Sequence, residues 1–212
     1  EFFGGNAPQS SYDNWISHTS EGIITEGFND YGPTWLDMQT NGFGDHRVLG
    51  QGSPTLDYWK IIFDNFVLGD TSLVDSLLQD SVNSFFYELV IFNDTSLNKT
   101  FHIIREQLDS SFVDQNEPDN DDDDVFGSFK NSWGMYIINP SSSREQVFIQ
   151  VPHPCDDFIA PYIAMDLYIQ TDAFGFMIAS ASRESDWNQI GTYSNSKSIS
   201  DPSRYPHTVF QI

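Results

Sequence analysis

The sequence contains little cysteine and few basic residues. Cys155 is the single cysteine among 212 residues, so the chain cannot form an intrachain disulfide and says little about the redox compartment. Lysine and arginine number 9 against 31 acidic residues, which gives a formal net charge of −22. Because nucleic acids and anionic membrane surfaces are bound by clustered basic side chains, we expect neither as a partner.

Long apolar runs and several common motifs are also missing. No stretch approaches the roughly 20 apolar residues that a membrane-spanning helix needs, so no membrane span is expected. No charged n-region with a following apolar h-region is seen at Glu1, and we expect that any signal peptide has been removed. The G-x-S-x-G, phosphate-loop and dinucleotide-binding motifs do not occur, which argues against the chemistries that they mark.

What the chain does contain is enough apolar material for a core. Hydrophobic residues make up 39% of the sequence and aromatic residues 15%, so general disorder is not expected. We interpret residues 1–212 as one α/β domain, with residues 1–55 as a loop-rich segment packed on it. The acidic charge fits a secreted protein, a saline habitat or a protein that collects divalent cations, and charge alone does not separate these. Two N-x-[ST] triplets, at Asn93 and Asn98, support the extracellular interpretation.

Two helices are predicted to form a helical hairpin that covers one face of a sheet. The first is Leu56–Leu68, which Gly69 can end, with apolar residues at helical spacing: Trp59, Ile62, Phe63 and Phe66. The second is Thr71–Ser84, with Leu73, Leu77 and Leu78 on one face.

Several strands are predicted outside these helices. Phe85–Asn93 and Thr100–Leu108 are β-rich runs around a polar turn and predict a β-hairpin. Phe129–Asn139 predicts a further strand, and Thr208–Ile212 predicts the start of another. A sheet that ends on such a strand indicates self-association or a C-terminal segment that is not present here.

An acidic stretch at residues 109–128 interrupts the strands. Its run of like charges is typical of a solvated loop. Carboxylate oxygens are also the ligands that calcium prefers, and Asp119, Asp121 and Asp123 are the candidates for such a site, although the EF-hand spacing is absent.

A strand–helix–strand unit is predicted at residues 146–180. Gln146–Val151 is a β-rich run that Pro152 ends, and Phe174–Ala179 is a short apolar run. Between them Pro161 favours a helix start, and the helical spacing predicts an apolar face of Ile159, Tyr162, Ile163 and Leu167. Such a unit is most simply a right-handed crossover between parallel strands, which predicts a mixed α/β sheet with antiparallel hairpins before it and helices on its faces.

The polar turn inside this unit carries the residues that favour a catalytic site. Open α/β sheets bind ligands at the carboxyl ends of their strands. His153 and Asp156 come just after the first strand of the unit, and Glu184 comes just after the second, so all three are expected at such ends. An imidazole and a carboxylate three residues apart can share a zinc ion, with Asp157 as a substitute for Asp156.

The His153-Pro-Cys-Asp156 turn resembles the H-x-x-E or H-x-x-D element of zinc carboxypeptidase-like hydrolases, of the N-formylglutamate amidohydrolase and deacylase type. The resemblance covers about the last third of the chain, and Asp201-Pro-Ser-Arg204 is similar to the D-x-N-R segment of that family, with Ser203 in place of its Asn. It implies zinc ligands His153 and Asp156 with a later histidine, which is His207 or lies beyond Ile212. It also implies that Arg183 and Arg204 hold a substrate carboxylate.

Three interpretations of the turn remain open. His153 can bond a backbone carbonyl while Asp156 and Asp157 cap the helix, or Cys155 at the helix N-terminus can act as a nucleophile. The metal interpretation predicts a secreted hydrolase of amide or peptide bonds near a carboxylate, in small molecules or peptides, with Asp157 or Glu184 as general base. The alternative function is a non-catalytic, acidic extracellular binding or assembly protein.

Overall fold

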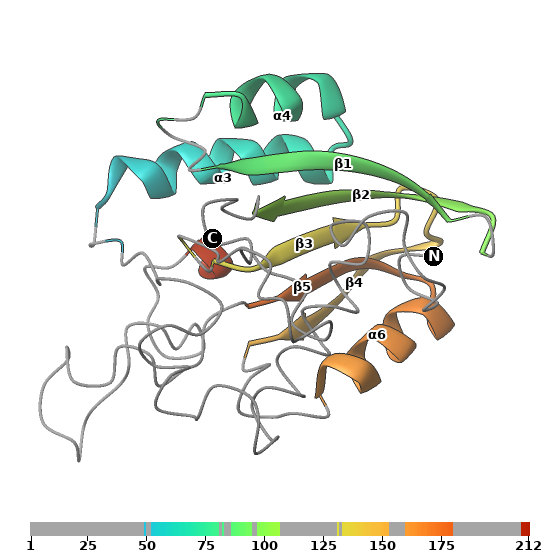
Figure 1. Cartoon of the computed structure of the whole chain (residues 1–212). Coiled ribbons are helices and arrows are strands. Elements are labelled where there is room, and N and C mark those ends of the chain that lie inside the picture. Colours follow the sequence, from blue (N-terminus) through green and yellow to red (C-terminus); the bar gives the residue numbers. More distant parts are fainter. Residues whose placement is uncertain are drawn as a thin grey trace, which may run out of the picture.

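The computed structural model describes residues 49, 52–80, 82, 86–94, 97–106, 131, 133–152, 160–179 and 209–212. In these residues a five-stranded sheet carries helices on both faces (Figure 1). All neighbouring strands are antiparallel except the last two, β5 and β4, which are parallel, so the predicted mixed α/β sheet is confirmed. In spatial order the strands are β1 (Tyr87–Asp94), β2 (Lys99–Glu106), β3 (Met135–Ile138), β5 (Ala173–Ile178) and β4 (Arg144–Val151).

The first helix, α3 (Pro54–Val67), has clear start and stop signals. Ser53 caps it by accepting a hydrogen bond from the backbone N–H of Thr55 at 3.3 Å, and a proline occupies the first helical position. Gly69 follows the last turn with φ +77, a left-handed conformation that glycine adopts without a Cβ penalty. The predicted helix and its glycine stop are therefore confirmed.

The second helix, α4 (Thr71–Leu78), is shorter than predicted. Asp70 caps it by accepting a hydrogen bond from the N–H of Leu73 at 3.1 Å, and the helix ends at Leu78 rather than Ser84. Leu73 is 41% exposed while Val74 is buried, so the predicted apolar face was wrong at that residue. Val74 and Leu78 are the residues of α4 that are buried in the core. They are four residues apart and therefore lie on the same face of the helix.

The α3–α4 hairpin covers one face of the sheet, as the sequence predicts. Trp59 of α3 is fully buried and makes edge contacts with the rings of Tyr87, at a centroid distance of 4.7 Å, and Trp133, at 5.7 Å. Val74 and Leu78 of α4 belong to the same core. This cluster forms the first of two apolar layers.

The second layer lies beneath α6 (Ala160–Gln170), the helix that joins the parallel strands β4 and β5. The predicted strand–helix–strand unit is confirmed, but its predicted apolar face was wrong at Ile163 and Leu167; Ile159 and the side chain of Tyr162 lie outside the described residues. Ile163 and Leu167 are about half exposed, whereas Ala164 and Tyr168 are buried. The ring of Tyr168 packs on rings from β2 and β5, which turns the adjacent stripe of the helix toward the sheet.

Two predicted strands differ from the structure. The third strand begins at Met135, after Gly134 with φ +108, and not at Phe129. Residues 209–211, predicted as the start of a strand, form a 3₁₀ turn, Val209–Gln211. Val209 and Phe210 are buried in the α3-side core, and this packing decides the local conformation.

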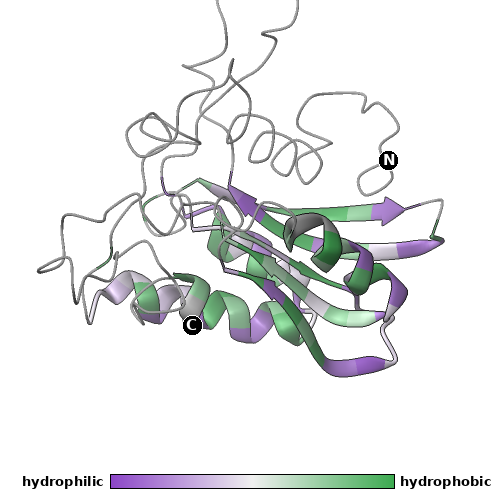
Figure 2. Cartoon of the chain, turned by 90° about the horizontal axis from the view of Figure 1, so that it is seen from below, coloured by the Kyte–Doolittle hydropathy of each residue, from purple (hydrophilic) through white to green (hydrophobic). Residues whose placement is uncertain are grey.

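The β1–β2 hairpin is confirmed, with eight paired residues in each strand. Figure 2 shows hydrophobic residues along the middle of the strands and hydrophilic residues at strand ends. Within the part of the chain that the structure describes, no helix is long and apolar enough to cross a membrane.

Candidate functional site

The carboxyl ends of three strands lie along one side of the sheet, which we call the carboxyl edge. Because β2, β5 and β4 run in the same direction, their last residues lie at one edge together with the first residues of β1 and β3. Val151 is the register partner of Ile178, and the N–H of Ala179 donates to the carbonyl of Val151 at 3.0 Å. The chain therefore leaves β4 and β5 at two adjacent points, which is the arrangement that open α/β sheets use for ligands.

The side chains predicted for this edge lie outside the described residues. His153 comes two residues after Val151, and Arg183 four residues after Ala179. Each proposed role therefore stays a prediction. The residues concerned are His153, Cys155, Asp156, Asp157, Arg183, Glu184, Arg204 and His207, together with the calcium candidates Asp119, Asp121 and Asp123.

Within the described ranges, no three His, Cys, Asp or Glu side chains gather as a metal site would require. Of the five histidines, only His102 falls inside those ranges. It lies within β2, where burial lowers the pKa of its imidazole, and its Nδ1 has no hydrogen-bond partner among the described residues. The imidazole is therefore neutral at neutral pH and belongs to the packed sheet.

A buried carboxylate lies at the same edge and was missed by sequence reasoning. Glu106, the last residue of β2, is 2% exposed. Its Oε1 accepts two hydrogen bonds of 2.7 Å from Asn131, one from the backbone N–H and one from Nδ2. The charge is thus compensated by amide donors, as a buried carboxylate requires. Glu106 is two residues after the buried Ile104, so strand alternation was the signal that could have predicted its inward position.

Two tyrosines complete this buried polar group. The hydroxyl of Tyr87 donates to the carbonyl of Gly134 at 3.1 Å, and that of Tyr136 donates to the carbonyl of Trp133 at 2.6 Å. Burial, followed by the nearby charge of Glu106, raises the pKa of both phenols well above the ordinary value. Both therefore remain protonated donors: the Tyr87 hydroxyl ties the start of β1 to the segment before β3, and the Tyr136 hydroxyl ties the start of β3 to the residues just before it.

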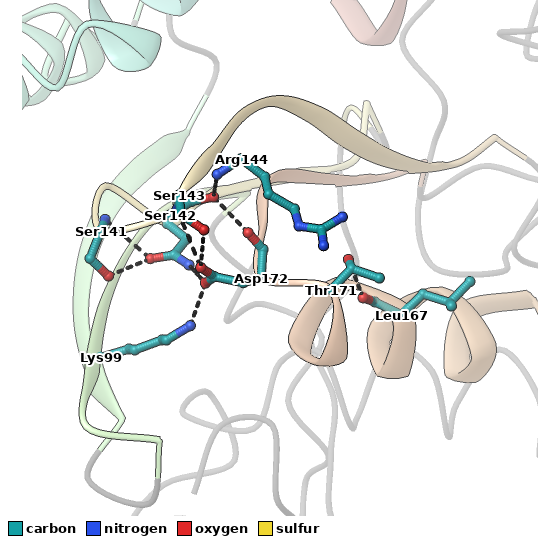
Figure 3. A network of polar contacts seen from close by, with 9 residues as sticks. Lys99, Ser141, Ser142, Ser143, Arg144, Leu167, Thr171 and Asp172 are labelled. Carbon is teal, nitrogen blue, oxygen red and sulfur yellow. Dashed lines mark hydrogen bonds and ion pairs between the residues drawn. The ribbon is translucent and has the colours of Figure 1, made fainter.

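A second polar group lies at the opposite edge, around Asp172 (Figure 3). Its carboxylate pairs with Lys99 of the β1–β2 hairpin and accepts from Asn139 Nδ2 at 2.8 Å. Its other oxygen accepts from the backbone N–H of Ser143 at 3.2 Å. One side chain thus links three turns, which indicates a structural rather than a catalytic role.

Asp172 is expected to contribute pH-dependent stability. The hydrogen bond from Lys99, then that from the Ser143 backbone, lower the pKa of this carboxyl from 3.8 to about 2. Because the folded-state pKa lies below the unfolded one, the contribution is present above about pH 4 and is lost as the pH falls toward about 2. Asp172 has φ +52, a left-handed conformation that asparagine also adopts readily. Asp172→Asn should therefore remove this part of the acid dependence of the unfolding free energy, measured by urea unfolding.

The matched control is Asp166→Asn, on an exposed position of α6. It should leave the pH dependence of the unfolding free energy unchanged. Equal acid dependence in Asp172→Asn and the wild type would contradict the assignment.

The chain matches no protein-family model, no curated protein and no solved structure. The resemblance of the His153–Asp156 turn to zinc carboxypeptidase-like hydrolases therefore stays a prediction.

Proposed function

We propose that the protein is a secreted metal-dependent hydrolase that acts on an amide or peptide bond near a carboxylate. The observation that carries the proposal is the parallel pairing of β4 and β5. It brings the point where the chain leaves β4, two residues before His153, next to the point where it leaves β5, four residues before Arg183. Loops that start side by side at the carboxyl ends of parallel strands are where α/β enzymes place their catalytic residues.

A third segment of the chain, the C-terminal 3₁₀ turn, also lies near this edge of the sheet and supports the proposal. Phe210 packs near Tyr136 of β3, with ring centroids 6.3 Å apart, and Tyr136 is the second residue from this edge of its strand. His207 precedes Phe210 by three residues. Three sequence-distant segments that carry candidate residues are thus attached near the same edge of the sheet.

The proposed roles follow the chemistry of the side chains. His153 and Asp156, with His207, would hold the metal, which when bound acidifies a water molecule and polarises a carbonyl. Asp157 or Glu184 would accept the proton of the attacking water. Arg183 or Arg204 would pair with the substrate carboxylate through a forked pair of N–H donors.

Metal content is the direct test. Protein purified without chelator or nickel resin should carry about one zinc ion per chain, as a single site with three protein ligands would. His153→Ala should lose the metal, because one neutral imidazole ligand disappears, while the far-UV circular dichroism stays that of the wild type. Elemental analysis by mass spectrometry measures the loss.

Cys155→Ser is the matched control, since it alters the same turn without removing a proposed ligand. It should keep both the metal and any acyl-amino-acid hydrolase activity. Metal retained by His153→Ala, or no metal in the wild type, would overturn the proposal. Activity lost only in Cys155→Ser would favour the thiol as nucleophile.

A second candidate function is a non-catalytic, acidic extracellular binding or assembly protein. The observation that favours it is the position of β4 at one end of the strand order, with Phe148 41% exposed on it. Unpaired edge strands are templates for association with another chain. A metal-free protein that forms stable oligomers in light scattering would favour this candidate over the hydrolase.

A further inference from the structure

An apolar pocket opens between the C-terminal half of α3 and the sheet, and it shares only Tyr136 with the polar groups described above. Its volume is about 170 Å³. Phe63, Phe66 and Val67 of α3 form one wall, and Tyr136 and Met177 belong to the strands that form the floor. Every one of these residues lies in the described part of the chain.

The pocket exists because α3 is centred on only part of the sheet. Trp59 of α3 contacts the ring of Tyr87 in β1, and Phe63 of α3 packs against Tyr136 in β3 at a centroid distance of 4.6 Å. Figure 1 shows α3 and α4 beside β1, at the side of the sheet opposite β4. The helix therefore forms a wall over β3, and the β5–β4 part of the same face continues the floor.

A glycine in β5 shapes the far wall. The ring of Phe148, from β4, lies directly over Gly175, where a Cβ would approach its Cδ1 to 2.2 Å. The absent side chain thus makes room for the Phe148 ring at the pocket boundary. Ile212 closes another side, and it is 42% exposed, as a rim residue would be.

The lining selects for an uncharged ligand. None of the described side chains that line the pocket carries a charge. Its phenolic hydroxyl, on Tyr136, already donates to a backbone carbonyl, and the sulfur of Met177 lies 3.6 Å from the Nε2 of Gln150 as an acceptor. A charged group placed here would lose its hydration without gaining a partner.

We propose that this pocket binds a small uncharged apolar molecule, of the size of one aromatic ring or a short alkyl chain. Cavities of roughly 150 Å³ lined by Leu, Ile and Phe bind benzene, so the volume suits a ligand of that class. The pocket uses none of the residues of the proposed metal site, and this inference therefore stands or falls independently of the hydrolase.

The test is binding of benzene and indole to the full chain, followed through the ¹³C-labelled methyl group of Met177. Both probes should shift this signal saturably, and benzoate should not, because its carboxylate would be buried unpaired. Val67→Trp should weaken the binding of both probes roughly tenfold or more, because the indole side chain occupies the rim of the pocket.

Leu68→Trp is the matched control, because Leu68 is 81% exposed and does not line the pocket. It should leave the affinities unchanged. Phe148→Ala, which removes one wall at a partly exposed position, should raise the affinity for indole relative to benzene. No saturable shift with either probe, equal weakening by both tryptophan variants, or equal binding of benzoate would overturn the inference.

Discussion

Replacement of Gly134 by alanine is expected to lower the free energy of unfolding by about 4 kcal/mol, one of the largest losses available to a single methyl group in this chain. Gly134 has φ +108, and a Cβ at this position would lie 2.3 Å from the backbone oxygen of Ile178. The new methyl group cannot be accommodated by a side-chain rotation, since the atom that it meets is main chain in the neighbouring strand. Its own carbonyl is also held, by the hydroxyl of Tyr87.

Gly69→Ala provides the control for backbone strain alone. Gly69 also has a positive φ, of +77, but a Cβ there meets nothing within 4 Å. It should cost only about 1 kcal/mol, the ordinary penalty of a left-handed alanine. Urea unfolding followed by circular dichroism measures both. Similar losses in the two variants would show that the approach of β3 to β5 is looser than described.

The second large effect is expected at Trp59. Truncation to alanine removes a fully buried indole that contacts rings from α3, β1 and the segment before β3, and should cost about 4 kcal/mol. Trp59→Phe keeps one ring in the same place and removes Nε1, which has no hydrogen-bond partner among the described residues. It should cost only about 1–2 kcal/mol, because the lost packing is partly offset by the removal of an unpaired donor.

The control for Trp59 is Ile61→Ala, at a half-exposed position of the same helix. It should change the unfolding free energy by less than about 0.5 kcal/mol. Unfolding in urea gives all three values. A phenylalanine variant as unstable as the alanine variant would mean that the aromatic contacts of Trp59 do not hold α3 on the sheet.

Two kinds of site are proposed in this fold, and they differ in what supports them. The hydrolase proposal rests on strand direction, since the residues that would act lie in segments attached to the carboxyl edge. The apolar pocket rests on a volume and on lining residues of α3, β3, β4 and β5. Metal analysis addresses only the first, and benzene binding only the second.

The sequence by itself determined the local elements that depend on short-range signals. The helical spacing that starts at Leu56 and the stop at Gly69 define α3, the β-rich runs around residue 95 define the hairpin, and the apolar segments on either side of α6 define the parallel pair. In each case neighbours in the chain supply the hydrogen-bond partner, the turn conformation or the periodicity that the element needs.

Tertiary packing determined which residues face the core and which local conformation forms where the sequence pattern allows more than one choice. Ile163 and Ala164 both suit an amphipathic helix, and only the fit of Tyr168 between two rings chose which stripe of α6 faces the sheet. Val209 suits a strand, but burial of it and Phe210 against the α3-side core made a 3₁₀ turn. The pairing of Glu106 with Asn131 and the pocket beside Phe148 depend on contacts between residues far apart in sequence, which no local pattern contains.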